Sequence, residues 1–160
     1  MYKSIFITAL AIISLTVSGQ KIPSVDIKTT TGKTFNTKSI ENNGKPIIIS
    51  FWATWCKPCI KELSAISDNY ADWQEQTGVK VIAVSTDDTR SMSRVAPFVN
   101  QKGWDFEVYC DPNGDLKRAM NVVNVPHTFL LDGKGNIVSQ HTTYVDGDET
   151  ELFKKILKLK

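Results

Sequence analysis

Hydrophobic positions along the chain switch between the spacing of buried strands and that of amphipathic helices. A continuous apolar run at 47–53 predicts a central strand that is buried on both faces of a sheet, and a second buried strand is expected at 79–85. Between them, from Pro58 to about 76, four apolar residues repeat at intervals of 3, 4 and 3: Leu63, Ile66, Tyr70 and Trp73. This spacing puts all four on one face of a helix, which Gly78 is expected to end.

The remaining segments continue the alternation of strand and helix. Short strands are expected as a hairpin at 25–27 and 33–35, and at 106–109, 127–131 and 137–143. Helices are expected at 87–102, 115–120 and 150–159. Asp87 and Asp88 would cap the first of these helices, and Pro97 would kink it. This order predicts an α/β fold with one mixed sheet, helices on both faces and no internal domain boundary.

The first 19 residues have the pattern of a signal peptide. Lys3 precedes an apolar run from Ile5 to Val17, which is shorter than the roughly 20 residues needed to cross a bilayer. Small residues follow, so cleavage after Gly19 is predicted, with an uncleaved membrane anchor as the alternative. In either case the domain at 20–160 is expected outside the cytoplasm, which in a Gram-negative cell means the periplasm.

Composition and charge narrow the classes of partner. Hydrophobic residues make up 41% and charged residues 22%, which excludes a disordered chain and a multi-pass membrane protein. Without the leader and its Lys3, the domain carries 18 basic and 17 acidic side chains, so nucleic acid is not an expected partner. Three cysteines are too few for a disulfide scaffold.

The candidate chemistry lies in the sequence Cys56-Lys57-Pro58-Cys59, between a buried strand and a helix. Cys56 would lie at the helix N-terminus, where unpaired N–H groups and the helix dipole stabilise a thiolate, and Lys57 adds positive charge. Cys59, one turn further on, would be more buried. The pair therefore predicts disulfide exchange, in which Cys56 attacks a substrate disulfide and Cys59 resolves the mixed disulfide.

The segment at 51–59, Phe-Trp-Ala-Thr-Trp-Cys-Lys-Pro-Cys, resembles the active-site segment of the thioredoxin superfamily. Within it, the chain most resembles the secreted thiol-disulfide oxidoreductases of the TlpA/ResA type. The N-terminal hairpin, a long segment after 79–85 and Glu62 carry that resemblance. It implies a thioredoxin fold with a hairpin and an insertion typical of TlpA-like proteins. It also implies no metal and no cofactor beyond a redox-active Cys56–Cys59 disulfide.

The resemblance also gives roles to residues outside the cysteine pair. Ser50 stands where plain thioredoxins have a buried aspartate, so Glu62, one turn after Cys59, is expected to transfer the proton of that thiol. A solvated helix residue is the alternative for Glu62. Val125-Pro126 matches the family's cis-proline site, where the Val125 backbone would pair with an extended substrate.

Further residues are expected to contact the substrate. Trp55 would flank the disulfide, with Lys57 and Pro58 beside it, whereas Trp52 is expected in the core. His127 would tune the Cys56 thiolate or contact substrate, or be an ordinary strand residue with a hydrogen-bonded ring. Cys110 is expected to be a buried, inert thiol, with an intermolecular disulfide or a second redox role as the alternatives.

The direction of electron flow is inferred from the same resemblance. Pro58 between the cysteines and Val125 before the cis-proline resemble the residues that thioredoxin-like reductants carry at these two positions. The expected activity is therefore reduction of secreted disulfide-bearing proteins, with apocytochrome c as one example. The expected electron donor is a membrane thiol relay of the DsbD/CcdA type. A disulfide oxidase or isomerase is the alternative direction.

Other chemistries fit the sequence less well. A peroxiredoxin-like peroxidase would have threonine three residues before its cysteine, whereas Thr54 lies two before Cys56. Ile60 follows the second cysteine where covalent haem attachment requires histidine. The known copper-handling thioredoxin-fold modules space their cysteines by three, not two. A structural zinc site would need a second pair of ligands in register, which the chain does not offer.

Overall fold

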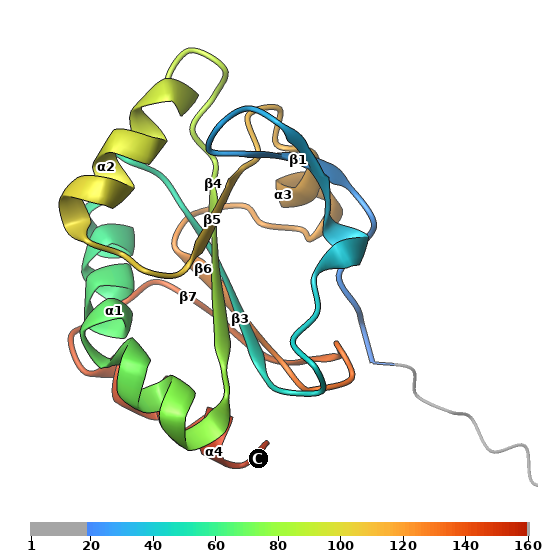
Figure 1. The fold of residues 1–160 in the computed structure, drawn as a ribbon, viewed down its shortest axis with the longest axis vertical. Coiled ribbons are helices and arrows are strands. Elements are labelled where there is room, and N and C mark those ends of the chain that lie inside the picture. The colour runs from blue at the N-terminus through green and yellow to red at the C-terminus, as the bar shows by residue number, and fades with distance from the viewer. Residues whose placement is uncertain (1–18, 160) are drawn as a thin grey trace, which may run out of the picture.

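The computed structural model describes residues 19–159 (Figure 1). The predicted signal peptide at 1–19 therefore lies, except for Gly19, outside the described residues. Within 19–159, no helix is both long enough and apolar enough to span a bilayer.

In the part of the chain that the structure describes, seven strands and four α-helices follow one another nearly as the hydrophobic pattern predicts. The strands are β1 (Asp26–Thr29), β2 (Thr34–Asn36), β3 (Ile47–Trp52), β4 (Lys80–Ser85), β5 (Glu107–Cys110), β6 (His127–Leu131) and β7 (Ile137–Thr142). The helices are α1 (Lys57–Thr77), α2 (Val95–Lys102), α3 (Asp115–Ala119) and α4 (Asp148–Leu157), with short 3-10 turns at Thr37–Ser39 and Met92–Arg94. The predicted N-terminal hairpin is confirmed, since β1 and β2 pair antiparallel.

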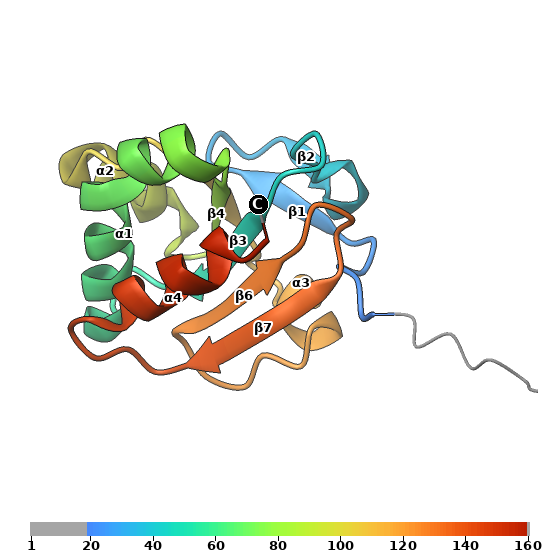
Figure 2. The same cartoon turned by 90° about the horizontal axis from the view of Figure 1, so that it is seen from below.

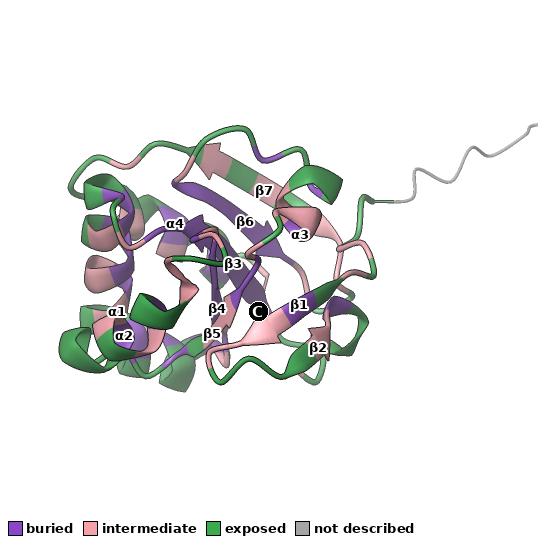
Figure 3. Cartoon of the chain, turned by 90° about the horizontal axis from the view of Figure 1, so that it is seen from above, coloured by how far each residue is buried: buried purple, intermediate pink, exposed green. Residues whose placement is uncertain are grey.

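All seven strands form one mixed sheet in the order β2-β1-β5-β4-β3-β6-β7. The central strand β3 runs parallel to β4 and antiparallel to β6, and each of its six residues is buried. Helices α1, α2 and α4 cover one face and α3 the other (Figure 2), as predicted. Burial is concentrated in the central strands and in the helix faces turned toward them (Figure 3). The predicted α/β thioredoxin-like architecture is thus confirmed.

Helix α1 begins and ends where its sequence dictates. Cys56 is the N-cap, and Pro58 occupies the first turn, where a proline breaks no intrahelical hydrogen bond. The four predicted apolar residues are all buried against the sheet: Leu63, Ile66, Tyr70 and Trp73. Gly78 ends the helix in the left-handed conformation, with φ of 69°, which glycine adopts at little cost. The chain therefore leaves β3 and presents the cysteines at the start of a helix packed on the sheet.

The expected helix cap at Asp87 or Asp88 is wrong. Helix α2 begins only at Val95, after a 3-10 turn. Asp88 instead closes the turn before it, where hydrogen bonds from Ser91 and then Arg90 lower the pKa of its carboxyl to about 2. Pro97 is the third residue of α2, so it lies in the first turn, where it replaces no hydrogen-bonded N–H, rather than kinking a longer helix.

Candidate active site

The two cysteines of the pair lie in different surroundings although only two residues separate them. They form a disulfide with an S–S distance of 2.04 Å and a Cα–Cα distance of 5.3 Å. As the N-cap of α1, Cys56 accepts the backbone N–H of Cys59 on its sulfur, at 3.3 Å. Cys56 keeps 4% of its surface exposed and Cys59 none. Helix N-terminal N–H groups stabilise a thiolate, so this geometry favours Cys56 as the attacking sulfur.

The loop leading into the pair is held by Asp87, which was expected to cap a helix. Asp87 is buried two residues after the end of β4 and accepts hydrogen bonds from the Thr54 backbone N–H at 2.8 Å and the Thr54 hydroxyl at 2.6 Å. Its carboxylate also accepts the Ser85 hydroxyl at 2.7 Å. Asp87 thus fixes the loop just before Cys56. Its position just past the carboxyl end of a buried strand was the available signal, because active-site residues of open α/β sheets gather at the carboxyl ends of strands.

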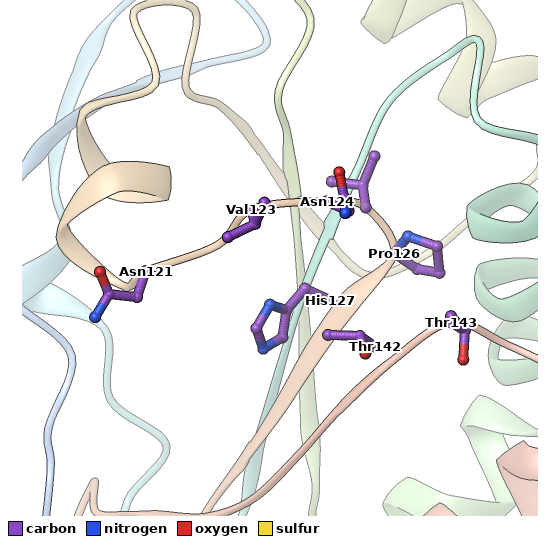
Figure 4. Close-up of a pocket in the computed structure, with 8 residues that line it drawn as sticks. Asn121, Val123, Asn124, Pro126, His127, Thr142 and Thr143 are labelled. Carbon is purple, nitrogen blue, oxygen red and sulfur yellow. The ribbon is translucent and has the colours of Figure 1, made fainter.

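The predicted cis-proline is confirmed, because the Val125–Pro126 bond is cis. Pro126 is buried and Val125 half-buried just before β6. Beside them lies a surface hollow of about 190 Å³, lined by residues of the segment before β6 and by the end of β7 (Figure 4). Trp55, Lys57 and Pro58 are exposed, and Trp55 keeps 69% of its surface in solvent. Their contact with substrate stays a prediction, as does pairing of the Val125 backbone.

His127 points to the side of β6 opposite the cysteine pair. Its ring stacks on Phe129 with centroids 4.4 Å apart, and its Nε2 lies 3.0 Å from Gln140 Oε1. Phe129 belongs to the core beneath α3, whereas Cys56 and Cys59 belong to the core beneath α1. In Figure 4 the imidazole lies away from the Pro126 ring. The ring of His127 is thus hydrogen-bonded and lies away from the Cys56 thiolate. His127 nevertheless lines the hollow beside Pro126, so its contact with substrate stays a prediction.

Glu62 is buried, with 1% of its surface exposed, so the alternative of a solvated helix residue is wrong. Its Oε1 lies 2.9 Å from the Thr128 hydroxyl of β6 and 2.7 Å from His141 Nε2 of β7. The Thr128 hydroxyl also lies 2.9 Å from Ser50 Oγ, the position at which plain thioredoxins carry aspartate. His141 was not among the residues predicted for the site. The signal was its place on the inward-facing side of β7, two residues after Ser139.

Cys110 is fully buried at the end of β5. Burial, and secondarily the nearby Asp87 carboxylate, raise the pKa of its thiol to about 11. A thiol with so high a pKa is almost entirely protonated at neutral pH, so the prediction of a buried, unreactive thiol is supported. Within residues 19–159, no group of three or more histidine, cysteine or acidic side chains is placed to hold a metal ion.

Comparison with known proteins gives concordant matches. The AhpC/TSA family model matches residues 18–140. The thiol-disulfide oxidoreductase ResA of Bacillus thuringiensis is 32% identical over 143 residues, covering 86% of this chain and 78% of the relative. The thioredoxin-like protein YneN of Bacillus subtilis is 31% identical over 134 residues, with coverages of 83% and 76%. The solution structure of a thioredoxin-like protein from Porphyromonas gingivalis is 52% identical, with a TM-score of 0.77 and coverages of 86% and 90%.

Proposed function

The chain belongs to the AhpC/TSA family and is a thiol-disulfide oxidoreductase, and from that premise we propose that it reduces disulfides of proteins outside the cytoplasm. The observation that carries this proposal is the asymmetry of the pair. Cys56 lies at the N-terminus of α1 with a helix N–H on its sulfur, while Cys59 is fully buried one turn further on. One sulfur is thus prepared to attack and the other to resolve.

The exchange transfers two electrons to the substrate. The Cys56 thiolate attacks one sulfur of the substrate disulfide, and the other substrate sulfur leaves with the bonding electron pair and takes up a proton. Cys59 then loses its proton and attacks Cys56 Sγ. The Cys56–Cys59 bond forms, and the second substrate sulfur leaves as a thiolate, which takes up a proton from water. The substrate ends as a dithiol and the protein as the disulfide that the structure contains.

The direction of exchange rests on the residues around the pair. Pro58 between the cysteines and Val125 before the cis-proline resemble residues of reductants, whereas Lys57 stabilises the thiolate and shifts the potential somewhat toward oxidants. An oxidase or isomerase is the opposite reading of the same site. The reduction potential of the pair separates the two directions.

Peroxide reduction fits the site less well than disulfide exchange. The peroxidase pattern needs a threonine three residues before the cysteine. Here Thr54 lies two residues before Cys56, and both its hydroxyl and its backbone N–H are committed to Asp87. A hydrogen peroxide consumption assay on the reduced protein tests this choice, and rapid turnover of peroxide would overturn it.

The site is proposed to work in an extracytoplasmic compartment after export by residues 1–19. The mass of the protein recovered from the periplasm, with or without those residues, tests this part. The proposed substrates are secreted disulfide-bearing proteins such as apocytochrome c. The proposed electron donor is a membrane thiol relay of the DsbD/CcdA type. Deleting that relay should leave the Cys56–Cys59 pair oxidised in cells, and a pair that stays reduced would exclude this donor.

The exchange reaction itself is tested by trapping its intermediate. Cys59→Ser should stop the reaction after the first attack and leave a substrate bound to Cys56 through a disulfide. Cys56→Ser should give no adduct at all. Cys110→Ser is the matched control, because its buried thiol takes no part, and it should exchange like the unmodified protein. Normal turnover by Cys59→Ser, measured by mass spectrometry and substrate thiol release, would refute the assigned roles.

A further inference from the structure

A row of three polar residues crosses the sheet beneath α1. Ser50 of β3 pairs in register with Thr128 of β6, which in turn pairs with His141 of β7. Glu62 reaches this row from α1 and places its Oε1 2.9 Å from the Thr128 hydroxyl and 2.7 Å from His141 Nε2. Three adjacent strands and a helix therefore converge on one buried carboxyl group.

We propose that His141 exchanges protons between Glu62 and solvent, and thereby positions Glu62 to serve Cys59 in the disulfide exchange proposed above. His141 does not touch the reacting sulfurs, so it is a positioning residue that acts through Glu62. The inference rests on the proposed function, because only disulfide exchange requires Cys59 to gain and lose a proton.

The need for such a route follows from burial. Cys59 has no exposed surface, so water cannot take its proton directly, and a group of the protein must accept it. Glu62 lies one helical turn beyond Cys59, on the same buried face of α1. Within residues 19–159, its second oxygen, Oε2, is buried with no hydrogen-bond partner. A buried carboxyl oxygen without a partner calls for an explanation, and a free acceptor for the Cys59 proton provides one.

Glu62 is almost as buried as Cys59, so the proton needs a further path to solvent. His141 provides one, because its side chain is 26% exposed while its Nε2 contacts Glu62. It lines a surface hollow of about 150 Å³. The charged side chains facing that hollow all come from α4: Asp148, Glu151 and Lys155. The imidazole thus links a buried carboxyl group to a hollow at the surface that charged side chains line.

The hydroxyl groups of the row stay hydrogen-bonded in both charge states of Glu62. Thr128 carries a single hydroxyl proton, so it cannot donate to both Ser50 and Glu62 at once. Opposite an ionised Glu62, which only accepts, Thr128 donates to Glu62 and Ser50 donates to Thr128. When Glu62 takes up the Cys59 proton on Oε2, its Oε1 still accepts from Thr128, so these donations persist without moving any heavy atom. Both charge states of Glu62 therefore keep hydrogen bonds.

The proposed proton transfer balances during resolution of the mixed disulfide. The Cys59 S–H proton passes to Glu62, the Cys59 thiolate attacks Cys56, and the departing substrate thiolate carries away the electron pair. The carboxyl group of Glu62 then turns so that its protonated oxygen faces His141 Nε2. The imidazole accepts this proton and releases one to water, so that the pair is ready for the next cycle. Reduction of the Cys56–Cys59 disulfide by its electron donor uses the same path in reverse.

The two chemical steps can be watched separately by stopped flow. A small aromatic disulfide that releases a coloured thiolate gives one thiolate when Cys56 attacks and a second when Cys59 resolves. His141→Gln keeps a hydrogen-bonding side chain but removes the imidazole that would carry the proton. It should leave the first phase unchanged, slow the second about 5- to 10-fold near pH 7, and alter its pH profile. Ser139→Ala, the next inward position on β7, is the control and should change neither phase.

A coupling test separates this role from a structural one. Glu62→Gln should slow the second phase more than His141→Gln does, and the double variant should be no slower than Glu62→Gln alone. Effects that multiply in the double variant, or a uniform slowing with an unchanged pH profile, would overturn the inference. If the unmodified protein released only one thiolate, the proposed exchange itself would fail, which is a distinct result.

Discussion

Replacing Asp87 by asparagine tests whether the active-site loop is held as described. The Asp87 carboxylate is 1% exposed and accepts three hydrogen bonds, two from Thr54 and one from Ser85. Asparagine has nearly the same shape, so the substitution leaves no cavity. It removes the charge and turns one acceptor into a donor, which the Thr54 hydroxyl can accommodate only by rotating. The change therefore isolates the electrostatic part of the loop's attachment.

The expected loss of stability follows from these three contacts. Hydrogen bonds to charged groups contribute about 1.5–3 kcal/mol each, and charge-assisted bonds are roughly twice as strong as neutral ones. Halving three such bonds would cost about 2–4 kcal/mol. Asparagine also removes the cost of burying a charge, which offsets part of this loss. A net destabilisation of about 2 kcal/mol is therefore expected, which would lower a urea midpoint by about 1 M.

Urea unfolding of the oxidised protein measures this effect, with Asp105→Asn as the matched control. Asp105 is exposed, so its substitution should change stability by less than about 0.5 kcal/mol. A looser loop should also slow the attack of Cys56 on a small aromatic disulfide in the Asp87 variant. A midpoint indistinguishable from that of Asp105→Asn would refute the argument that Asp87 holds the loop.

Two further predictions concern residues away from the cysteine pair. Burial raises the pKa of the Cys110 thiol from 9.0 to about 11, so its thiolate should be about 100-fold scarcer than that of an exposed thiol. Alkylation of Cys110 at pH 8 should therefore require unfolding. Rapid labelling of Cys110 in the native protein would contradict this. The neutral thiol of Cys110 is favoured in the folded state, so it should contribute stability below pH 9 that is lost as the pH rises toward 11. Alkaline unfolding of the protein, with Cys110→Ser as the reference, measures this loss. In Gly133→Ala the new Cβ would overlap the Gly44 carbonyl oxygen. In Gly135→Ala the new side chain meets no neighbour, and placing alanine at a φ of 80° costs only about 1–2 kcal/mol of stability. Gly133→Ala should therefore be the less stable variant, and equal urea midpoints would exclude the overlap.

The sequence predicts most of the fold because its local signals agree with one another. The apolar run of β3 and the helical repeat of α1 both depend on neighbouring residues, and both are found where expected. The cis bond before Pro126 was expected from family resemblance alone, since no local pattern demands it.

What the sequence misses depends on contacts between distant residues. Asp87 precedes a polar segment and therefore has the composition of a helix cap, but the hydrogen bonds it accepts come from Thr54, 33 residues earlier. Glu62 and His141 are 79 residues apart, so only the pairing of β3, β6 and β7 beneath α1 reveals their contact. Sequence periodicity gives the face on which His141 lies but not the group it meets.

The reduction potential of the Cys56–Cys59 pair tests the proposed direction of exchange most directly. The domain at 20–160 would be equilibrated in graded dithiol and disulfide buffers, and its redox state read by thiol alkylation. Cys110 stays buried and should not contribute to the labelling. A potential near or below roughly −230 mV is predicted, because a reductant must give up its electrons to its substrates. A potential above roughly −150 mV would contradict the account and identify the protein as a disulfide oxidant.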